Sequence, residues 1–74
     1  MFREPFGTRL RSLRERAGMT QAELAQKIGT DRSTLSRWER NFILPGLTTV
    51  EQLAMILSVS AAELLTGDPP KSPK

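Results

Sequence analysis

The sequence predicts an all-α fold, a compact bundle of five helices. Apolar residues recur at helical spacing in successive segments, and no segment alternates apolar and polar residues as a strand would. A capping residue or a glycine separates each segment from the next. With 74 residues, the chain is long enough for one domain with a small core and too short for two.

The helix boundaries follow from the residues that begin and end helices. Thr20 and Glu23 have the spacing of a capping box, and Ser60 and Glu63 repeat it. Asp31 is expected to cap the helix between them. The predicted helices cover residues 6–17, 21–28 and 32–40, a segment beginning near residue 48, and a short last segment that ends at Gly67.

The segments outside these helices differ in character. Residues 1–67 are expected to form the domain, and the proline-rich residues 68–74 a flexible tail or linker. The loop Asn41–Leu47 is unusually apolar, and its first residue is of a type that tolerates the left-handed backbone at a helix end. Trp38 is predicted to pack in the core, and Met19 and Met55 are expected to fill it as well.

The composition argues against an enzyme. The chain contains no His, Cys or Tyr, which removes the usual general base, the thiol nucleophile and the common zinc ligands. We therefore expect no catalytic residue, no metal site and no cofactor. No apolar run approaches the roughly 20 residues of a membrane span, and the N-terminus has no signal-peptide core. A cytoplasmic protein without a membrane partner is expected.

The third predicted helix has one face made only of arginine and serine. This cationic face contains Arg32, Ser33, Ser36, Arg37 and Arg40. At about 100° per residue, it lies opposite Leu35 and Trp38. An ordinary solvated helix face mixes acidic and basic residues. Arginine can bind guanine O6 and N7 together, and serine can contact base edges or phosphates. The face favours contact with double-stranded DNA, and a basic surface patch is the alternative.

Residues beside the cationic face are candidates for phosphate contacts. Gln21 begins a helix, where free backbone N–H groups and the helix dipole favour an anion, although a plain exposed polar residue is equally consistent. Arg40 and Asn41 follow the cationic face and are candidates for holding the other strand. Three arginines of the first helix are interpreted as solvated charges, with phosphate contact as the alternative: Arg9, Arg11 and Arg16.

A family resemblance rests on FGTRLRSLRERAGMTQAELAQKIGTDRSTLSRWER followed by PGLTTVEQLAMILSVSAAELLTG, which together span residues 6–67. These segments resemble the lambda-repressor-like, Xre/Cro-type helix-turn-helix domain of bacteria and phages. The positions that match the family's spacing are Gln21, Leu24, Ala25, Gly29, Ser33, Leu35 and Glu39. The resemblance implies a third helix in the major groove and a homodimer that contacts two half-sites about 34 Å apart.

The resemblance also assigns roles to individual residues. The positions where the family contacts base edges are Arg32, Ser33 and Arg37, with Ser36 a secondary candidate. Gln21 falls where a glutamine contacts phosphate and supports the first of these residues, and Thr34 falls where the family often touches the backbone. Arg14 and Glu39 match a structural ion pair between the first helix and the end of the third.

The loop after the third helix departs from the family pattern. Many members have Asn-Gly and then basic residues, whereas Asn41 is followed here by Phe42, Ile43 and Leu44. One of these three is expected to pack on the core. Exposed apolar surface tends to mark an interface, so the loop is expected to contribute to the dimer contact or to bind a partner protein, with local packing as the alternative.

These features predict a DNA-binding transcriptional regulator, most simply a repressor that binds a palindromic operator as a homodimer. It would be bacterial or phage-encoded, and associated with the nucleoid when bound. Two alternatives stay open. A restriction-modification controller resembles the chain in size, and an antitoxin-like protein-interaction module would use residues 42–44 as its contact surface.

Overall fold

The computed structural model describes residues 4–67, and within this range it contains five α-helices and no strand. The helices are α1 (Phe6–Arg16), α2 (Gln21–Ile28), α3 (Arg32–Glu39), α4 (Leu47–Leu57) and α5 (Ala61–Thr66). The predicted fold class is confirmed. The predicted tail, residues 68–74, lies outside the described residues.

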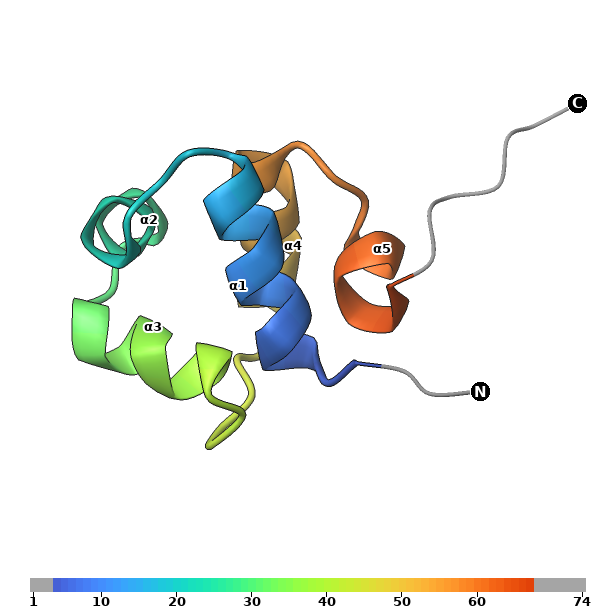
Figure 1. Ribbon diagram of the computed structural model, residues 1–74, viewed down its shortest axis with the longest axis horizontal. Helices are drawn as coiled ribbons and strands as arrows, with labels where there is room; N and C mark the ends of the chain where they lie inside the picture. Colours follow the sequence, from blue (N-terminus) through green and yellow to red (C-terminus); the bar gives the residue numbers. More distant parts are fainter. Residues whose placement is uncertain (1–3, 68–74) are drawn as a thin grey trace, which may run out of the picture.

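The five helices enclose one core. Figure 1 shows α1 and α4 at the centre of the molecule, α2 and α3 together on one side, and α5 on the other. α1 packs against α3 and α5, and α2 packs against α3 and α4. Each helix contributes one leucine without solvent exposure: Leu10, Leu24, Leu35, Leu53 and Leu64. The apolar faces predicted from helical spacing therefore meet at a single centre.

Local side-chain caps fix where three helices begin. Thr20 accepts the N–H of Glu23 at 3.0 Å, and the Glu23 carboxylate accepts the N–H of Thr20 at 2.8 Å, so the predicted capping box is confirmed. Asp31 accepts the backbone N–H three residues later at 2.7 Å. Ser60 does the same at 2.9 Å, but the part of the chain described here shows no return bond that would complete a second box.

Two predictions about apolar side chains can be judged from their exposure. Trp38 is buried in the core, and Met19 packs against it while partly buried. Met55, by contrast, is 79% exposed. Its predicted place in the core is wrong, because α4 turns Val50, Leu53, Ala54 and Leu57 inward and leaves Met55 on the opposite face.

The loop between α3 and α4 leaves all three of its apolar residues in solvent. Phe42, Ile43 and Leu44 are 64%, 48% and 71% exposed, so the expectation that one of them packs on the core is wrong. The backbone explains this difference. Asn41 adopts the left-handed conformation (φ 65°), and the N–H of Phe42 returns to the carbonyl of Arg37 at 3.0 Å. The chain therefore turns back over the end of α3, and Figure 1 shows the loop projecting from the bundle.

The start of α1 lies directly on the end of α3, a contact that the sequence did not reveal. The N–H of Gly7 donates to the side-chain oxygen of Asn41 at 2.8 Å. A Cβ atom on Gly7 would lie 2.2 Å from the carbonyl oxygen of Trp38 and 2.6 Å from that of Glu39. Only glycine allows this approach, so the first turn of α1 fixes the last turn of α3.

We predict that Gly7→Ala destabilises the protein by roughly 1–3 kcal/mol, the usual cost of forcing extra atoms into a packed site. The clash is with backbone atoms, which cannot rotate away. The free energy of unfolding in urea measures the effect. Gly46→Ala is the matched control, because its Cβ would meet nothing within 4 Å and its φ is −68°. A stability change of the same size in both variants would contradict the proposed contact.

Candidate nucleic-acid interface

The cationic face of α3 is formed as predicted. Leu35 and Trp38 hold the helix on the core, and the opposite side of the helix faces solvent. An open hollow runs along this side, and its lining residues are Gln21, Asp31, Arg32, Ser33, Ser36, Arg37 and Arg40. All members of the cationic face therefore lie together, with the first residue of α2 beside them.

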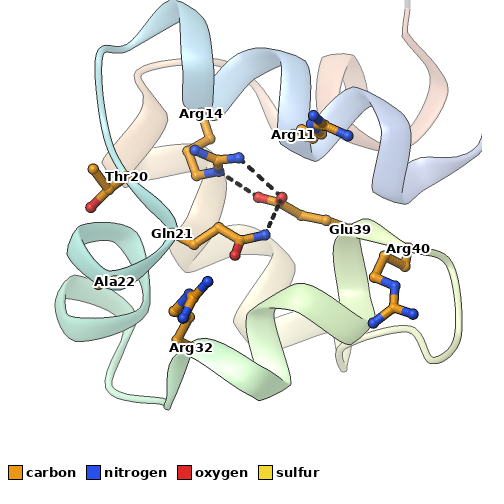
Figure 2. Close-up of a pocket in the computed structure, with 8 residues that line it drawn as sticks. All are labelled: Arg11, Arg14, Thr20, Gln21, Ala22, Arg32, Glu39 and Arg40. Carbon is orange, nitrogen blue, oxygen red and sulfur yellow. Dashed lines mark hydrogen bonds and ion pairs between the residues drawn. The ribbon is translucent and has the colours of Figure 1, made fainter.

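A second hollow lies between α1, α2 and α3 (Figure 2). The residues that line it are Arg11, Arg14, Thr20, Gln21, Ala22, Arg32, Glu39 and Arg40. It shares Gln21, Arg32 and Arg40 with the first hollow, so the two form one continuous basic surface. The one acidic residue among its lining side chains is Glu39.

A buried hydrogen-bond network neutralises Glu39. Arg14 donates from Nε to Oε2 at 2.6 Å and from a terminal nitrogen to Oε1 at 3.2 Å, and the Gln21 amide donates to Oε1 at 3.0 Å. The side chains of Arg14 and Glu39 are 9% and 2% exposed. The structural ion pair expected between them is present. The hydrogen bond to Glu39 and the charges of Glu39 and Glu15 raise the pKa of Arg14, against the lowering effect of burial.

Gln21 connects this network to the cationic face. Figure 2 shows its side chain between the Arg14–Glu39 pair and Arg32. The bond to Glu39 was not predicted from the sequence, and it fixes the orientation of the Gln21 amide. The backbone N–H groups of Gln21 and Ala22, in the first turn of α2, have no intrahelical acceptor. Donors at a helix N-terminus beside arginines favour an anion at this place.

Asp31 lies at the edge of the cationic face, where its carboxylate accepts hydrogen bonds from the first turn of α3. Its carboxylate accepts the N–H of Thr34 at 2.7 Å and the hydroxyl of Ser33 at 3.1 Å. These hydrogen bonds, with a smaller contribution from the charge of Arg37, lower the pKa of Asp31. The hydroxyl hydrogen of Ser33 is thereby committed, so Ser33 presents its oxygen lone pairs to solvent as an acceptor.

The other predicted contact residues lie outside both hollows. Thr34 is half-buried, and its N–H is used in capping α3. The side-chain oxygen of Asn41 accepts the N–H of Gly7, which leaves the amide hydrogens of Asn41 free to donate. Phe42, Ile43 and Leu44 follow on the exposed loop. The two hollows therefore follow α3 from its N-cap to Arg40 at its C-cap and do not extend onto the loop.

Of the α1 arginines interpreted as solvated charges, Arg11 is exposed as expected, whereas Arg9 is tied to backbone carbonyls. Arg11 lines the second hollow and pairs with Glu15 at 3.2 Å; its position three residues before Arg14 could have indicated this location. Arg9 donates to the carbonyl of Leu64 at 2.9 Å and also bonds the carbonyls of Leu65 and Glu4. No local sequence signal indicates that tie between α1 and α5.

We predict that Glu39→Ala destabilises the protein by about 3–5 kcal/mol, because it leaves Arg14 charged and buried without its carboxylate. Denaturant unfolding measures the effect. Glu15→Ala is the control: Glu15 is 55% exposed, and a surface pair of this kind contributes at most about 1 kcal/mol. Equal losses in the two variants would contradict the role assigned to Glu39.

Comparison with known proteins agrees with this geometry. The model of the helix-turn-helix family matches residues 10–64. The HTH-type transcriptional regulator ImmR of Bacillus subtilis is 37% identical over 62 residues, which are 84% of this chain and 49% of ImmR. The chain thus spans about half the length of this relative.

Among the described residues, no helix has the length and apolar character that crossing a membrane requires.

Solved structures share the fold. The P22 c2 repressor in complex with a synthetic operator has a TM-score of 0.82 and 31% identity, over 88% of this chain and 98% of the repressor chain. The restriction-modification controller C.AhdI from Aeromonas hydrophila has a TM-score of 0.76 and 38% identity, over 81% and 87% of the two chains. The chain belongs to the lambda-repressor-like, Xre/Cro-type helix-turn-helix family of DNA-binding domains, which are not enzymes.

Proposed function

We propose that this chain is the DNA-binding part of a transcriptional regulator that recognises a specific double-stranded sequence through the major groove. α3 enters the groove with its cationic face toward the base edges. One observation carries the proposal: the candidate base-contacting residues, Gln21 and Arg40 line a single hollow whose one acid, Asp31, is occupied by hydrogen bonds. The shared fold with a repressor bound to its operator supports it.

The base contacts are assigned from donor and acceptor chemistry. Arg32 and Arg37 are exposed and form no ion pair within residues 4–67, so each can donate to O6 and N7 of a guanine. Ser33, whose hydroxyl hydrogen goes to Asp31, accepts from an exocyclic amino group of adenine or cytosine. Ser36 is half-buried and is therefore a secondary candidate for a base contact.

The phosphate contacts hold α3 in register. Gln21 and the free N–H groups at the start of α2 bind one phosphate, and Arg40 binds another. Asn41 contributes its amide hydrogens, because its oxygen is bonded to Gly7. Thr34 contributes through its hydroxyl. These contacts supply affinity that depends on salt and not on sequence.

The regulator acts in the cytoplasm as a homodimeric repressor on a palindromic operator, whose half-sites are about one helical turn, or 34 Å, apart. The exposed loop residues Phe42, Ile43 and Leu44 contribute to the dimer contact or to a contact with a partner protein. Their exposure, and the absence of core packing, supports an interface at this loop.

Two alternative functions have support from particular observations. The likeness to C.AhdI, a restriction-modification controller, supports that function for this chain. The exposed residues 42–44 support an antitoxin-like docking module. A salt titration separates docking from DNA binding, because affinity for duplex DNA falls steeply with salt when phosphates are contacted. If the chain shows no salt-dependent binding to duplex DNA, the docking alternative is supported.

We predict that Arg37→Ala lowers affinity for the preferred duplex by about 1–3 kcal/mol and removes the preference at one base pair. The preferred duplex is first selected from a random pool, and its consensus also shows whether the site is palindromic. Gln21→Ala is expected to weaken binding to selected and random DNA alike. Equal loss on both kinds of DNA for Arg37→Ala would refute its assignment as a base contact.

We predict that Ile43→Asp shifts the chain toward monomer and lowers its affinity for a two-half-site operator, because a carboxylate cannot be buried in an apolar contact without cost. Sedimentation equilibrium and operator titration measure the two effects. Met55→Asp places the same charge on an exposed apolar site of α4 and is expected to change neither. If Ile43→Asp leaves association and DNA affinity unchanged, the loop is not the dimer contact.

A further inference from the structure

Phe42 stands apart from the other exposed residues of its loop, because its ring has a defined partner. The guanidinium carbon of Arg40 lies 4.5 Å from the centroid of the Phe42 ring. This is the range of an arginine–aromatic stack. Within residues 4–67, the Arg40 side chain forms no hydrogen bond or ion pair with protein atoms, so the Phe42 ring is what holds it.

The backbone at the end of α3 fixes this stack. Asn41 donates its N–H to Trp38 at 3.2 Å, and Phe42 donates its N–H to Arg37 at 3.0 Å. With Asn41 left-handed at φ 65°, these two bonds are those of a Schellman motif. The motif sets the Phe42 backbone relative to α3, so the ring lies beside Arg40 at the end of the cationic face.

Stacking leaves the hydrogen-bonding capacity of Arg40 intact. A guanidinium stacks through its flat face, whereas its N–H donors point outward in the plane. Arg40 can therefore rest on the ring and bind a phosphate at the same time. A long, flexible side chain loses conformational freedom when it binds. An arginine already held on a ring loses less.

We propose that Phe42 is a positioning residue that holds Arg40 ready for a DNA phosphate; this inference rests on the function proposed above. Arg40 lines both hollows, so the stack fixes the position of a side chain that the two hollows share. The loop would thus support phosphate binding indirectly, by holding Arg40 on an aromatic ring. A basic loop side chain would instead bind the phosphate with its own charge.

A double-mutant cycle on Phe42 and Arg40 tests the proposal, with Kd measured on the selected duplex and on random duplex DNA. Phe42→Ala is expected to weaken binding to both about 2- to 5-fold, the range for an exposed cation–π pair. Arg40→Ala is expected to weaken binding further and to reduce the slope of log K against log salt by about one. In the Arg40→Ala background, Phe42→Ala should then have no further effect.

Two further variants separate the platform from other roles of the loop. Phe42→Trp preserves the aromatic face and should retain binding, whereas Phe42→Leu keeps apolar bulk and should behave as Phe42→Ala. Met55→Ala, an equally simple loss of exposed apolar surface, should leave Kd unchanged. Thermal unfolding confirms that each variant is folded. Because Phe42 also belongs to the proposed dimer contact, sedimentation measures the association state of each variant, and Kd is compared at concentrations where the variants and the parent chain share one state.

The outcomes distinguish this inference from the proposed function. If Phe42→Ala weakens binding as much with Arg40 absent as with Arg40 present, or if Phe42→Leu retains full binding, Phe42 does not act through Arg40. In that case DNA binding by the parent chain still supports the proposed function. If the parent chain shows no salt-dependent binding to duplex DNA, the proposed function fails, and this inference fails with it.

Discussion

The buried carboxylate of Glu39 determines how the three helices around the basic surface are arranged. Glu39 is the last residue of α3, Arg14 reaches it from α1, and Gln21 reaches it from the start of α2. Apolar packing alone tolerates small rotations of one helix against another, whereas three directed hydrogen bonds do not. Gly7 adds a second fixed point on the same turn. The orientation of the cationic face therefore follows from how the end of α3 is held.

The same contacts explain how the surface stays basic although acidic residues lie next to it. Nine of the eleven Lys and Arg residues lie in residues 1–45, together with five acids. Of the two acids beside the cationic face, Glu39 is paired with Arg14 in the interior, whereas Asp31 caps α3 and keeps its negative charge. Without Arg14, the carboxylate of Glu39 would oppose an approaching phosphate. Here each acid stabilises the helix that carries the arginines.

Local signals made most of the fold predictable. Thr20, Asp31 and the helix-ending glycines act on backbone groups within a few residues, so the helices were located to within one or two residues. Contacts distant in sequence were not predictable: Gly7 with Asn41, Arg9 with Leu64, and Gln21 with Glu39. The exposure of Met55 follows from its phase on α4, opposite Val50, Leu53 and Leu57, which apolar character alone does not indicate. The candidate base contacts followed from helical phase, while their joint placement in one hollow required the tertiary structure.

The apolar loop bears on the selectivity of the proposed DNA contact. Each phosphate contact by a basic side chain adds affinity for any duplex, and this contribution is lost as salt rises. The uncharged loop residues Phe42, Ile43 and Leu44 cannot add such contacts, and they lie outside the candidate base-contacting residues of α3. Affinity for random DNA should fall by a larger factor than affinity for the operator if the loop also joins two copies, since dimerisation strengthens binding only where two half-sites are correctly spaced. An uncharged loop would then favour discrimination between operator and random DNA, with Arg40 on its aromatic support providing the proposed phosphate contact at the end of α3.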